Sequence, residues 1–134
     1  MKKISILMLL MAALSLASCN HTSVSEFVDS DTVRLEIDGT PVFVYSDNDC
    51  QLSFNRTRNI FRAQTDTALE WFSVSLDEVP ERDGDKTLAS VSWSTNGIEK
   101  ARNNITLEAH AVKGDVIWLC DNTRRVAVVV RILE

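Results

Sequence analysis

Residues Arg125-Val126-Ala127-Val128-Val129-Val130-Arg131-Ile132-Leu133 form the stretch of the chain that favours β-structure most strongly. One phase of its two-residue repeat consists of β-branched residues, namely Val126, Val128, Val130 and Ile132. β-Branched side chains lose freedom in a helix and pack well on a pleated strand. The stretch therefore predicts a strand. Because an open edge of this composition would invite aggregation, we expect the strand to pair inside a sheet.

The run just before it, Val116 to Cys120, predicts a partner strand. Asp121-Asn122-Thr123-Arg124 separates the two runs and is typical of a turn. Trp118 shares one phase with the two ends of the run, while the other phase holds Ile117 and Leu119. Both phases are apolar, which predicts a strand that is buried on both faces.

The same period of two recurs along the chain from residue 32. Asp38-Gly39 and Asn96-Gly97 are typical of tight hairpin turns, and the acidic stretch Asp77–Lys86 is typical of a solvated loop. Residues 98–102 could form one helical turn at most. The further alternating runs are 33–37, 42–44, 50–54, 60–63, 69–76, 88–93 and 105–111.

The pattern predicts an all-β fold of about eight short antiparallel strands in one domain, residues 32–134. Even spacing of strands and turns in about 100 residues favours a β-sandwich, and a small closed β-barrel is the alternative. The sandwich resembles an immunoglobulin domain in size and strand number. The residue match departs from that family, because Trp71 lies far downstream of Cys50 and Trp118 takes the place of the corner tyrosine.

The first 19 residues carry an export pattern. Lys2 and Lys3 precede an apolar run, residues 4–17, which is shorter than the roughly 20 residues of a spanning helix. The run ends in Leu16-Ala17-Ser18-Cys19, which resembles the lipobox of bacterial lipoproteins. The resemblance implies that residues 1–18 are a removed signal peptide and that residues 19–31 are a lipidated N-terminus with a short polar tether. The alternative is an ordinary cleaved signal peptide with an incidental cysteine.

Lipidation of Cys19, the site that the resemblance implies, would anchor the protein to a membrane. More than one acyl chain on one residue gives stable anchoring, since each buried methylene contributes about 0.8 kcal/mol. Asn20 follows the cysteine in place of the aspartate that resembles an inner-membrane retention signal. We therefore expect the outer membrane, with the domain facing the periplasm or the cell surface.

The charge balance argues against nucleic acid as a partner. The chain has a formal net charge of −5, and removal of Lys2 and Lys3 leaves 12 basic residues against 19 acidic ones, a net charge of −7. An acidic domain without a basic stripe is repelled by phosphate backbones.

Two cysteines remain once Cys19 is assigned to lipid. In an oxidising compartment Cys50 and Cys120 could form a disulfide, and closing a loop of about 70 residues would stabilise the fold by about 4 kcal/mol. Both cysteines also lie among apolar neighbours, where a buried thiol behaves as a small hydrophobe. The sequence leaves both alternatives open.

We find no pattern for catalysis, a metal ion or a cofactor. The only histidines are His21 in the tether and His110, which shares a phase with polar residues. Paired carboxylates occur at Asp47 and Asp49 and in the acidic loop, but both pairs lie among polar residues rather than in the apolar pocket that an acid catalyst needs. Neither loop has the spacing of a calcium-binding loop.

Four residues are candidates for ligand or partner contact. Trp71 is out of phase with the apolar residues of its run, which predicts an outward-facing indole. An exposed indole is the usual platform for stacking on a sugar ring or anchoring a partner, and the alternative, which we favour, is a sandwich-edge tryptophan covered by a loop. The others are the local cationic cluster of Arg56, Arg58 and Arg62, whose guanidinium groups could receive a carboxylate or sulfate. The alternative is that these arginines balance nearby acidic residues, which is the more common role of such a cluster.

Two triplets resemble the Asp-Ser/Thr-apolar motif at which some gut-dwelling Gram-negative bacteria O-glycosylate exported proteins. They are Asp31-Thr32-Val33 and Asp66-Thr67-Ala68. The resemblance implies glycosylation at Thr32 and Thr67.

Taken as a whole, the chain resembles the small β-sandwich lipoproteins of Gram-negative gut commensals. The resemblance implies a non-enzymatic, lipid-anchored binding or structural module, an accessory component that contacts an envelope protein or a glycan and needs no cofactor. An accessory subunit of an envelope assembly is favoured over a free-standing glycan binder, because the sequence has no dense aromatic stripe. Two alternatives remain open. One is a glycan-active enzyme that uses loop carboxylates, and the other is a small-ligand carrier if the strands close into a barrel.

Overall fold

The computed structural model describes residues 31–123 and 125–133, and these fold into nine strands and one short 3-10 turn. The elements in chain order are β1 (Thr32–Ile37), β2 (Thr40–Ser46), η2 (Asp47–Asp49), β3 (Gln51–Asn55), β4 (Ile60–Gln64), β5 (Trp71–Leu76), β6 (Lys86–Thr95), β7 (Ile98–Lys113), β8 (Val116–Cys120) and β9 (Val126–Arg131). The all-β class predicted from the sequence is confirmed.

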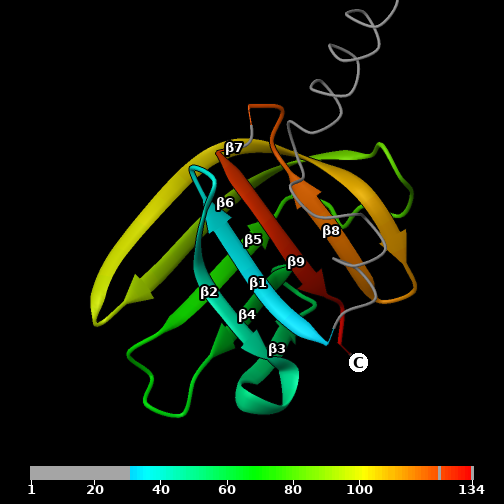
Figure 1. The fold of residues 1–134 in the computed structure, drawn as a ribbon. Coiled ribbons are helices and arrows are strands. Elements are labelled where there is room, and N and C mark those ends of the chain that lie inside the picture. The colour runs from blue at the N-terminus through cyan, green and yellow to red at the C-terminus, as the bar shows by residue number, and fades with distance from the viewer. Residues whose placement is uncertain (1–30, 124, 134) are drawn as a thin grey trace, which may run out of the picture.

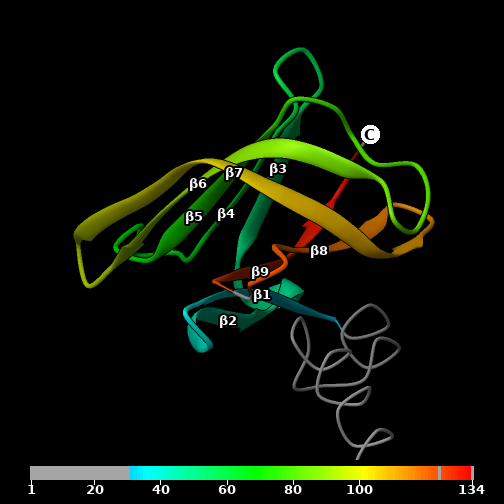
Figure 2. The same cartoon turned by 90° about the horizontal axis from the view of Figure 1, so that it is seen from above.

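All nine strands belong to one antiparallel sheet, in the order β2-β1-β9-β8-β7-β6-β5-β4-β3. Figures 1 and 2 show that the sheet curls into a half-barrel around its interior. The two-sheet sandwich expected from strand number is therefore not what the strands form. The closed barrel is not formed either, because β2 and β3 remain the two edges of the sheet.

The C-terminal strand lies inside the sheet, as its composition predicts. Strand β9 lies between β1 and β8, with Val128 opposite Leu35 on one side and opposite Leu119 on the other. The most β-prone stretch of the chain thus has a partner along each edge, and neither edge is left open.

The longest strand corrects one expectation. Residues 98–102, expected to form at most a helical turn, are the start of the 16-residue strand β7. The hairpin of β6 and β7 turns at Asn96-Gly97, where both residues have positive φ, 53° and 82°. Side chains at the start of β7 are exposed on both faces, so this part of the strand has no apolar alternation to mark it.

The concave face of the half-barrel holds the main core. Every strand except β3 contributes fully buried apolar side chains to it, and β3 adds the partly buried Leu52 and Phe54. Edge strand β2 reaches across this interior, because the ring of Phe43 lies 5.0 Å from that of Phe72 on β5 in an edge-on arrangement. The interior is thus filled by side chains.

Irregularities in three strand pairs accompany the curl. The register shifts at Leu35/Glu36 in β1, at Ala89/Val91 in β6 and at Ala109/Ala111 in β7. Such bulges bend a strand and increase its local twist. At one end of the half-barrel, η2 connects the two edge strands, β2 and β3.

Candidate functional site

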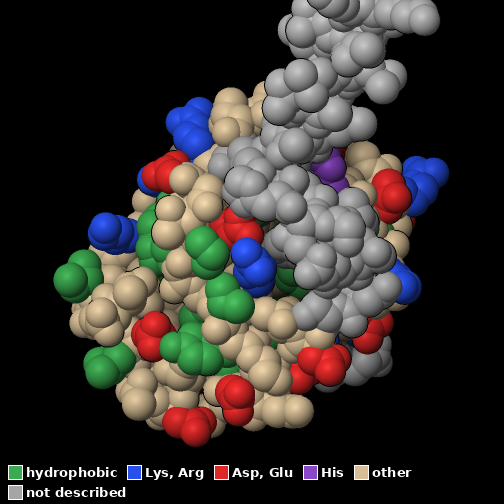
Figure 3. All heavy atoms as spheres, viewed as in Figure 1, with side chains coloured by type: hydrophobic (Ala, Val, Ile, Leu, Met, Phe, Trp, Pro, Cys, Tyr) green, Lys and Arg blue, Asp and Glu red, His purple; other side chains and the backbone are tan. Residues whose placement is uncertain are grey.

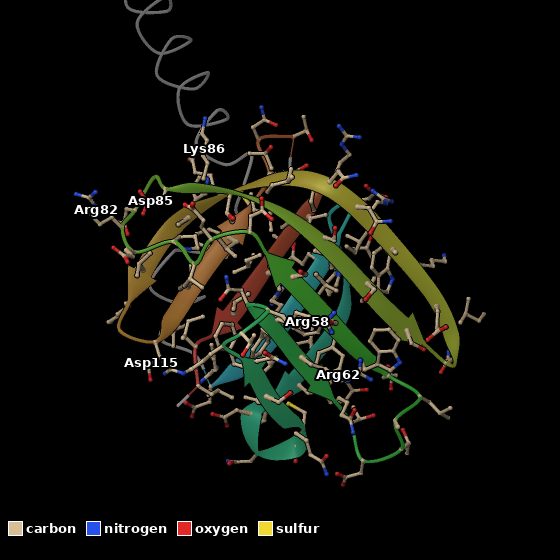
Figure 4. All side chains as sticks on the ribbon, turned by 180° about the vertical axis from the view of Figure 1, so that it is seen from behind. Arg58, Arg62, Arg82, Asp85, Lys86 and Asp115 are labelled. Atoms are coloured by element: carbon tan, nitrogen blue, oxygen red, sulfur yellow. The ribbon has the colours of Figure 1, made fainter. Side chains whose placement is uncertain are left out.

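The convex face of β3, β4, β5 and β6 presents polar side chains in cross-strand rows. Phe61 and Ala63 of β4 and Phe72 and Val74 of β5 are buried in the core, so the residues between them face outward. One row is Gln51, Gln64, Trp71 and Ser94, and the next is Ser53, Arg62, Ser73 and Ser92. We call these two rows, on the side of the molecule turned to the viewer in Figure 4, the polar face.

Trp71 is the only aromatic side chain in these two rows. It is half-buried and faces outward, as its phase predicts. The guanidinium carbon of Arg62 lies 4.4 Å from the centre of the indole ring, a cation–π contact. Arg62 Nε also donates a hydrogen bond to Gln64 Oε1 at 3.2 Å. The indole, the guanidinium and the amide therefore form one connected group.

Next to this group the surface is hollowed. A shallow cavity of about 210 Å³ is lined by Gln51, Leu52, Ser53, Arg62 and Gln64. Gln64 Nε2 donates to Gln51 Oε1 at 3.4 Å. Within residues 31–123 and 125–133, Arg62 forms no ion pair with a carboxylate, so its charge remains available to a ligand.

The loop between β4 and β5 borders the polar face and is held to the neighbouring hairpin. The carbonyl oxygen of Leu69 accepts hydrogen bonds from Ser94 Oγ at 2.9 Å and from the Gly97 N–H at 3.2 Å. The side chain of Leu69 is 56 % exposed, and that of Ile98 in the same hairpin is 64 % exposed. An apolar rim therefore lies beside the strand end that carries Trp71.

Of the three arginines, only Arg62 joins this group. Arg56 and Arg58 lie in the turn between β3 and β4, which Asn55 shapes by accepting hydrogen bonds from the Thr57 and Arg58 N–H groups at 3.0 and 3.1 Å. The predicted cluster is thus divided between a turn and a strand. Arg58 and Arg62 are both labelled in Figure 4.

Cys50 and Cys120 lie on opposite faces of the sheet. Cys50 has a free thiol, packs against the main core and donates to the carbonyl oxygen of Ser46 at 3.4 Å. Burial, and then the charge of Asp47, raise the pKa of this thiol. Cys120 is buried in a second apolar cluster, with Trp118 and Val129. A bridge between Cys50 and Cys120 is therefore not formed, because the sheet separates them.

A second hollow lies on the convex side of β6, β7 and β8, and sequence reasoning did not find it. Its volume is about 210 Å³, and its lining residues are Lys86, Thr106, Glu108, His110, Cys120, Asp121 and Asn122. Glu108 lies 3.5 Å from His110 and 3.9 Å from Lys86. The shared outward phase of Thr106, Glu108 and His110 was the available signal, but the contribution of β6 and β8 depends on strand order.

The carboxylate pairs hold loops rather than facing a common pocket. Asp83 Oδ1 accepts the Val112 N–H at 2.9 Å, and Asp85 Oδ2 accepts the Glu81 and Arg82 N–H groups at 3.0 and 3.1 Å. Asp47 lies 3.6 Å from Arg131. In the described ranges, no group of three or more His, Cys, Asp or Glu side chains could hold a metal ion.

The remaining predicted sites lie at the edges of the described structure or beyond them. Thr32 is the first residue of β1, and Thr67 lies exposed in the loop between β4 and β5, where its hydroxyl accepts the Leu69 N–H at 3.4 Å. Cys19, the signal peptide and the tether up to residue 30 lie outside the described residues.

Comparisons with protein-family models, with curated proteins and with solved structures give no match. Among the described residues, no helix is long and apolar enough to span a bilayer. Figure 3 shows acidic and basic side chains intermixed over the visible described surface, rather than a single basic patch.

Proposed function

We propose that the chain is a lipid-anchored, non-enzymatic binding module of the bacterial outer membrane and that it holds a glycan on its polar face. The anchor follows from the resemblance of Leu16-Ala17-Ser18-Cys19 to a lipobox. The observation that carries the ligand class is the connected group of Trp71, Arg62 and Gln64 beside a shallow hollow.

The chemistry of this group suits a sugar. An indole offers a flat apolar surface to the C–H groups of a pyranose ring, and amides and hydroxyls exchange hydrogen bonds with its hydroxyl groups. Gln51, Gln64, Ser53 and Ser73 supply such groups on two neighbouring rows. The guanidinium of Arg62 adds a fork that fits a carboxylate or sulfate, which favours acidic glycans.

The alternatives have less support. The carboxylates that a glycosidase would need accept backbone hydrogen bonds in loops, as described above for Asp83 and Asp85. A carrier would need an interior cavity, whereas the concave face is packed with buried side chains. An envelope protein remains the second candidate partner, because the exposed Leu69 and Ile98 beside the polar face could contact one.

Binding of soluble protein from residue 20 to 134 to a panel of neutral and acidic polysaccharides tests the proposal. Affinity gel electrophoresis reports binding without depending on the fluorescence of Trp71. We expect retardation by at least one glycan and its loss in Trp71→Ala. Arg62→Ala should weaken acidic glycans more than neutral ones, whereas Arg56→Ala in the adjoining turn should leave binding unchanged.

Absence of retardation across the panel would contradict the glycan proposal. The partner would then be sought as a protein, by crosslinking in the intact envelope.

A further inference from the structure

The edge strand β3 lacks several features that usually keep a sheet edge from pairing with another chain. Its residues, Gln51-Leu52-Ser53-Phe54-Asn55, include no charge and no proline, and they pair with β4 without a register shift. The other edge, β2, contains Pro41, which has no N–H group, and a register irregularity opposite Leu35 and Glu36. Proline, bulges and charged side chains are among the features that protect an edge. Of the two edges, β3 is therefore the one open to a further strand.

The outer side of β3 offers both backbone groups and apolar surface. Among the described strands β3 pairs with β4 alone, so alternate residues direct their N–H and C=O groups away from the sheet. Gln51, Ser53 and Asn55 are exposed on the convex side. Leu52 and Phe54 pack against the main core but are only partly buried. An added strand would pair the open backbone groups and bury more of these two side chains.

The sequence of β3 is complementary to itself in an antiparallel pair centred on Ser53, where this residue lies opposite the partner's Ser53. On the concave side Leu52 lies opposite the partner's Phe54, so apolar side chains meet. On the convex side Gln51 lies opposite the partner's Asn55, and the two amides can exchange hydrogen bonds. No like charges face each other, an arrangement that would destabilise the pair. A second copy of the chain thus fits this edge along its whole length.

We propose that two copies of the chain pair through β3 about a twofold axis at Ser53, which joins their sheets into one continuous sheet. Such a contact uses the β3 edge of both copies and leaves only the β2 edges, with Pro41, at the ends. The assembly therefore closes as a dimer and does not extend into a fibre. Five residues a side are few beside the roughly 20–30 of a standard interface, so the dimer is weak in dilute solution.

The dimer would also complete the hollow of the polar face. Gln51 and Ser53 of the edge strand line this hollow, and pairing places the partner's Asn55 and Ser53 beside them. The two Trp71 side chains would lie on the same face, five strand spacings apart across the sheet, or about 24 Å. One glycan chain that reaches both sites would bind with a gain in avidity. This consequence rests on the proposed function, but the pairing itself does not.

Small-angle X-ray scattering of the soluble chain, residues 20–134, tests the pairing, because all nine strands lie within this range. The parent carries Cys50→Ser, since the free thiol of Cys50 could crosslink two copies. We expect the scattering mass to rise toward that of a dimer as the concentration approaches about 1 mM, the effective concentration that a short tether imposes. Ser53→Lys places like charges opposite each other at the axis and should abolish the rise. Ala101→Lys, exposed on β7, is the matched control and should retain it.

Disulfide formation measures the register independently. In the same parent, Ser53→Cys places two thiols on paired strands whose Cα atoms lie about 4.5–5.5 Å apart, within reach of a disulfide. Mild oxidation should convert most of this variant into a covalent dimer, whereas Ala101→Cys, nine strand spacings from its counterpart, should stay monomeric.

Two results would overturn the proposal. One is a monomer throughout the concentration series, and the other is a dimer that persists in Ser53→Lys and does not crosslink in Ser53→Cys. Neither measurement involves a glycan, so failure of the pairing and failure of the proposed glycan binding are distinguishable.

Discussion

At the residue scale, the turn between β1 and β2 depends on the backbone of Gly39. Its φ is +80°, in the left-handed region that costs an L-residue about 1–2 kcal/mol. A methyl group at this position would meet nothing within 4 Å, so Gly39→Ala isolates the backbone cost. We expect a loss of about 1 kcal/mol in the free energy of unfolding, measured by urea denaturation. Thr40→Ala, which is exposed, is the control, and an unchanged midpoint for Gly39→Ala would show that the turn has another conformation.

Tyr45 provides a prediction on pH, because it is the only tyrosine of the chain. Its hydroxyl donates to Glu70 Oε2 at 2.5 Å, and this hydrogen bond, then burial, then the charge of Glu70 raise the pKa of the phenol. The neutral phenol is therefore favoured by folding. Its contribution to stability is complete below the unfolded pKa of about 10 and is lost as pH rises through the higher folded pKa.

Phenolate absorbance measures this pKa directly in the folded protein. We expect Glu70→Gln to lower the pKa of Tyr45 toward its ordinary value, because both the acceptor charge and its repulsion of a phenolate are removed. The stability difference between the parent and Tyr45→Phe should correspondingly shrink above a pH of about 10. An unshifted titration in Glu70→Gln would show that the hydrogen bond does not control the phenol.

The direction of a single side chain was predictable where its neighbours are clearly apolar. Trp71 faces outward because Phe72 and Val74 face inward, and the sequence alone indicates this. Its contact with Arg62 was not predictable, because it depends on the register of β4 against β5. The opposite faces of Cys50 and Cys120 were missed for a related reason, since β8 is apolar in both phases and its inward phase cannot be chosen from the sequence.

At the element scale, β2 depends on a side chain that crosses the interior. The strand has a ladder with β1 alone, and Phe43 contacts Tyr45 on its own strand at 4.8 Å between ring centres and Phe72 on β5 at 5.0 Å. We expect Phe43→Ala to lower the free energy of unfolding by about 3–5 kcal/mol, since it leaves a cavity and removes the contact with β5.

Hydrogen exchange shows whether Phe43→Ala destabilises β2 alone or the whole sheet. Amides of β2 should lose protection more than those of β9, which has a partner on each side. Val44→Ala on the same strand, where the side chain is 42 % exposed, should change stability by no more than about 0.5 kcal/mol. Equal effects of the two changes would contradict the role given to Phe43.

The sequence predicts where strands and hairpins occur better than it predicts how long each strand is. Turns with a positive-φ pair, such as Asp38-Gly39 and Asn96-Gly97, mark hairpins in the sequence itself. Strand β7 was divided into two segments, because its first five residues have no buried face and Asn104 interrupts the alternation with a φ of 56°. Only its ladder with β6, from Thr95 opposite Ile98 onward, shows that it is continuous.

At the scale of the whole molecule, period-two alternation predicts the all-β class but not the way the sheet closes. A strand with one buried face has the same pattern in a sandwich and in a curled sheet. The difference lies in pairings between distant segments, above all β1 with β9, which sequence spacing does not reveal. The polar face depends on the register of four neighbouring strands, so it could not be assembled from the sequence.

The anchoring of the whole molecule is the last prediction. If Cys19 is lipidated, export in a Gram-negative host should place the protein in the outer-membrane fraction, with a mass that shows loss of residues 1–18 and gain of acyl chains. Cys19→Ala removes the site of lipidation, so the protein should move from the detergent phase to the aqueous phase of a phase separation. Even one acyl chain binds a membrane only marginally, and the variant would carry none. Cys50→Ser keeps the anchor and should fractionate as the parent does.

Two outcomes would contradict the anchoring and would have different meanings. A parent that partitions into the aqueous phase would indicate an ordinary signal peptide. A Cys19→Ala variant that stays with the membrane would instead indicate attachment through the folded domain, whose exposed apolar residues beside the polar face, Leu69 and Ile98, would be the first to change. Because the glycan proposal rests on Trp71 and Arg62, it is independent of both outcomes.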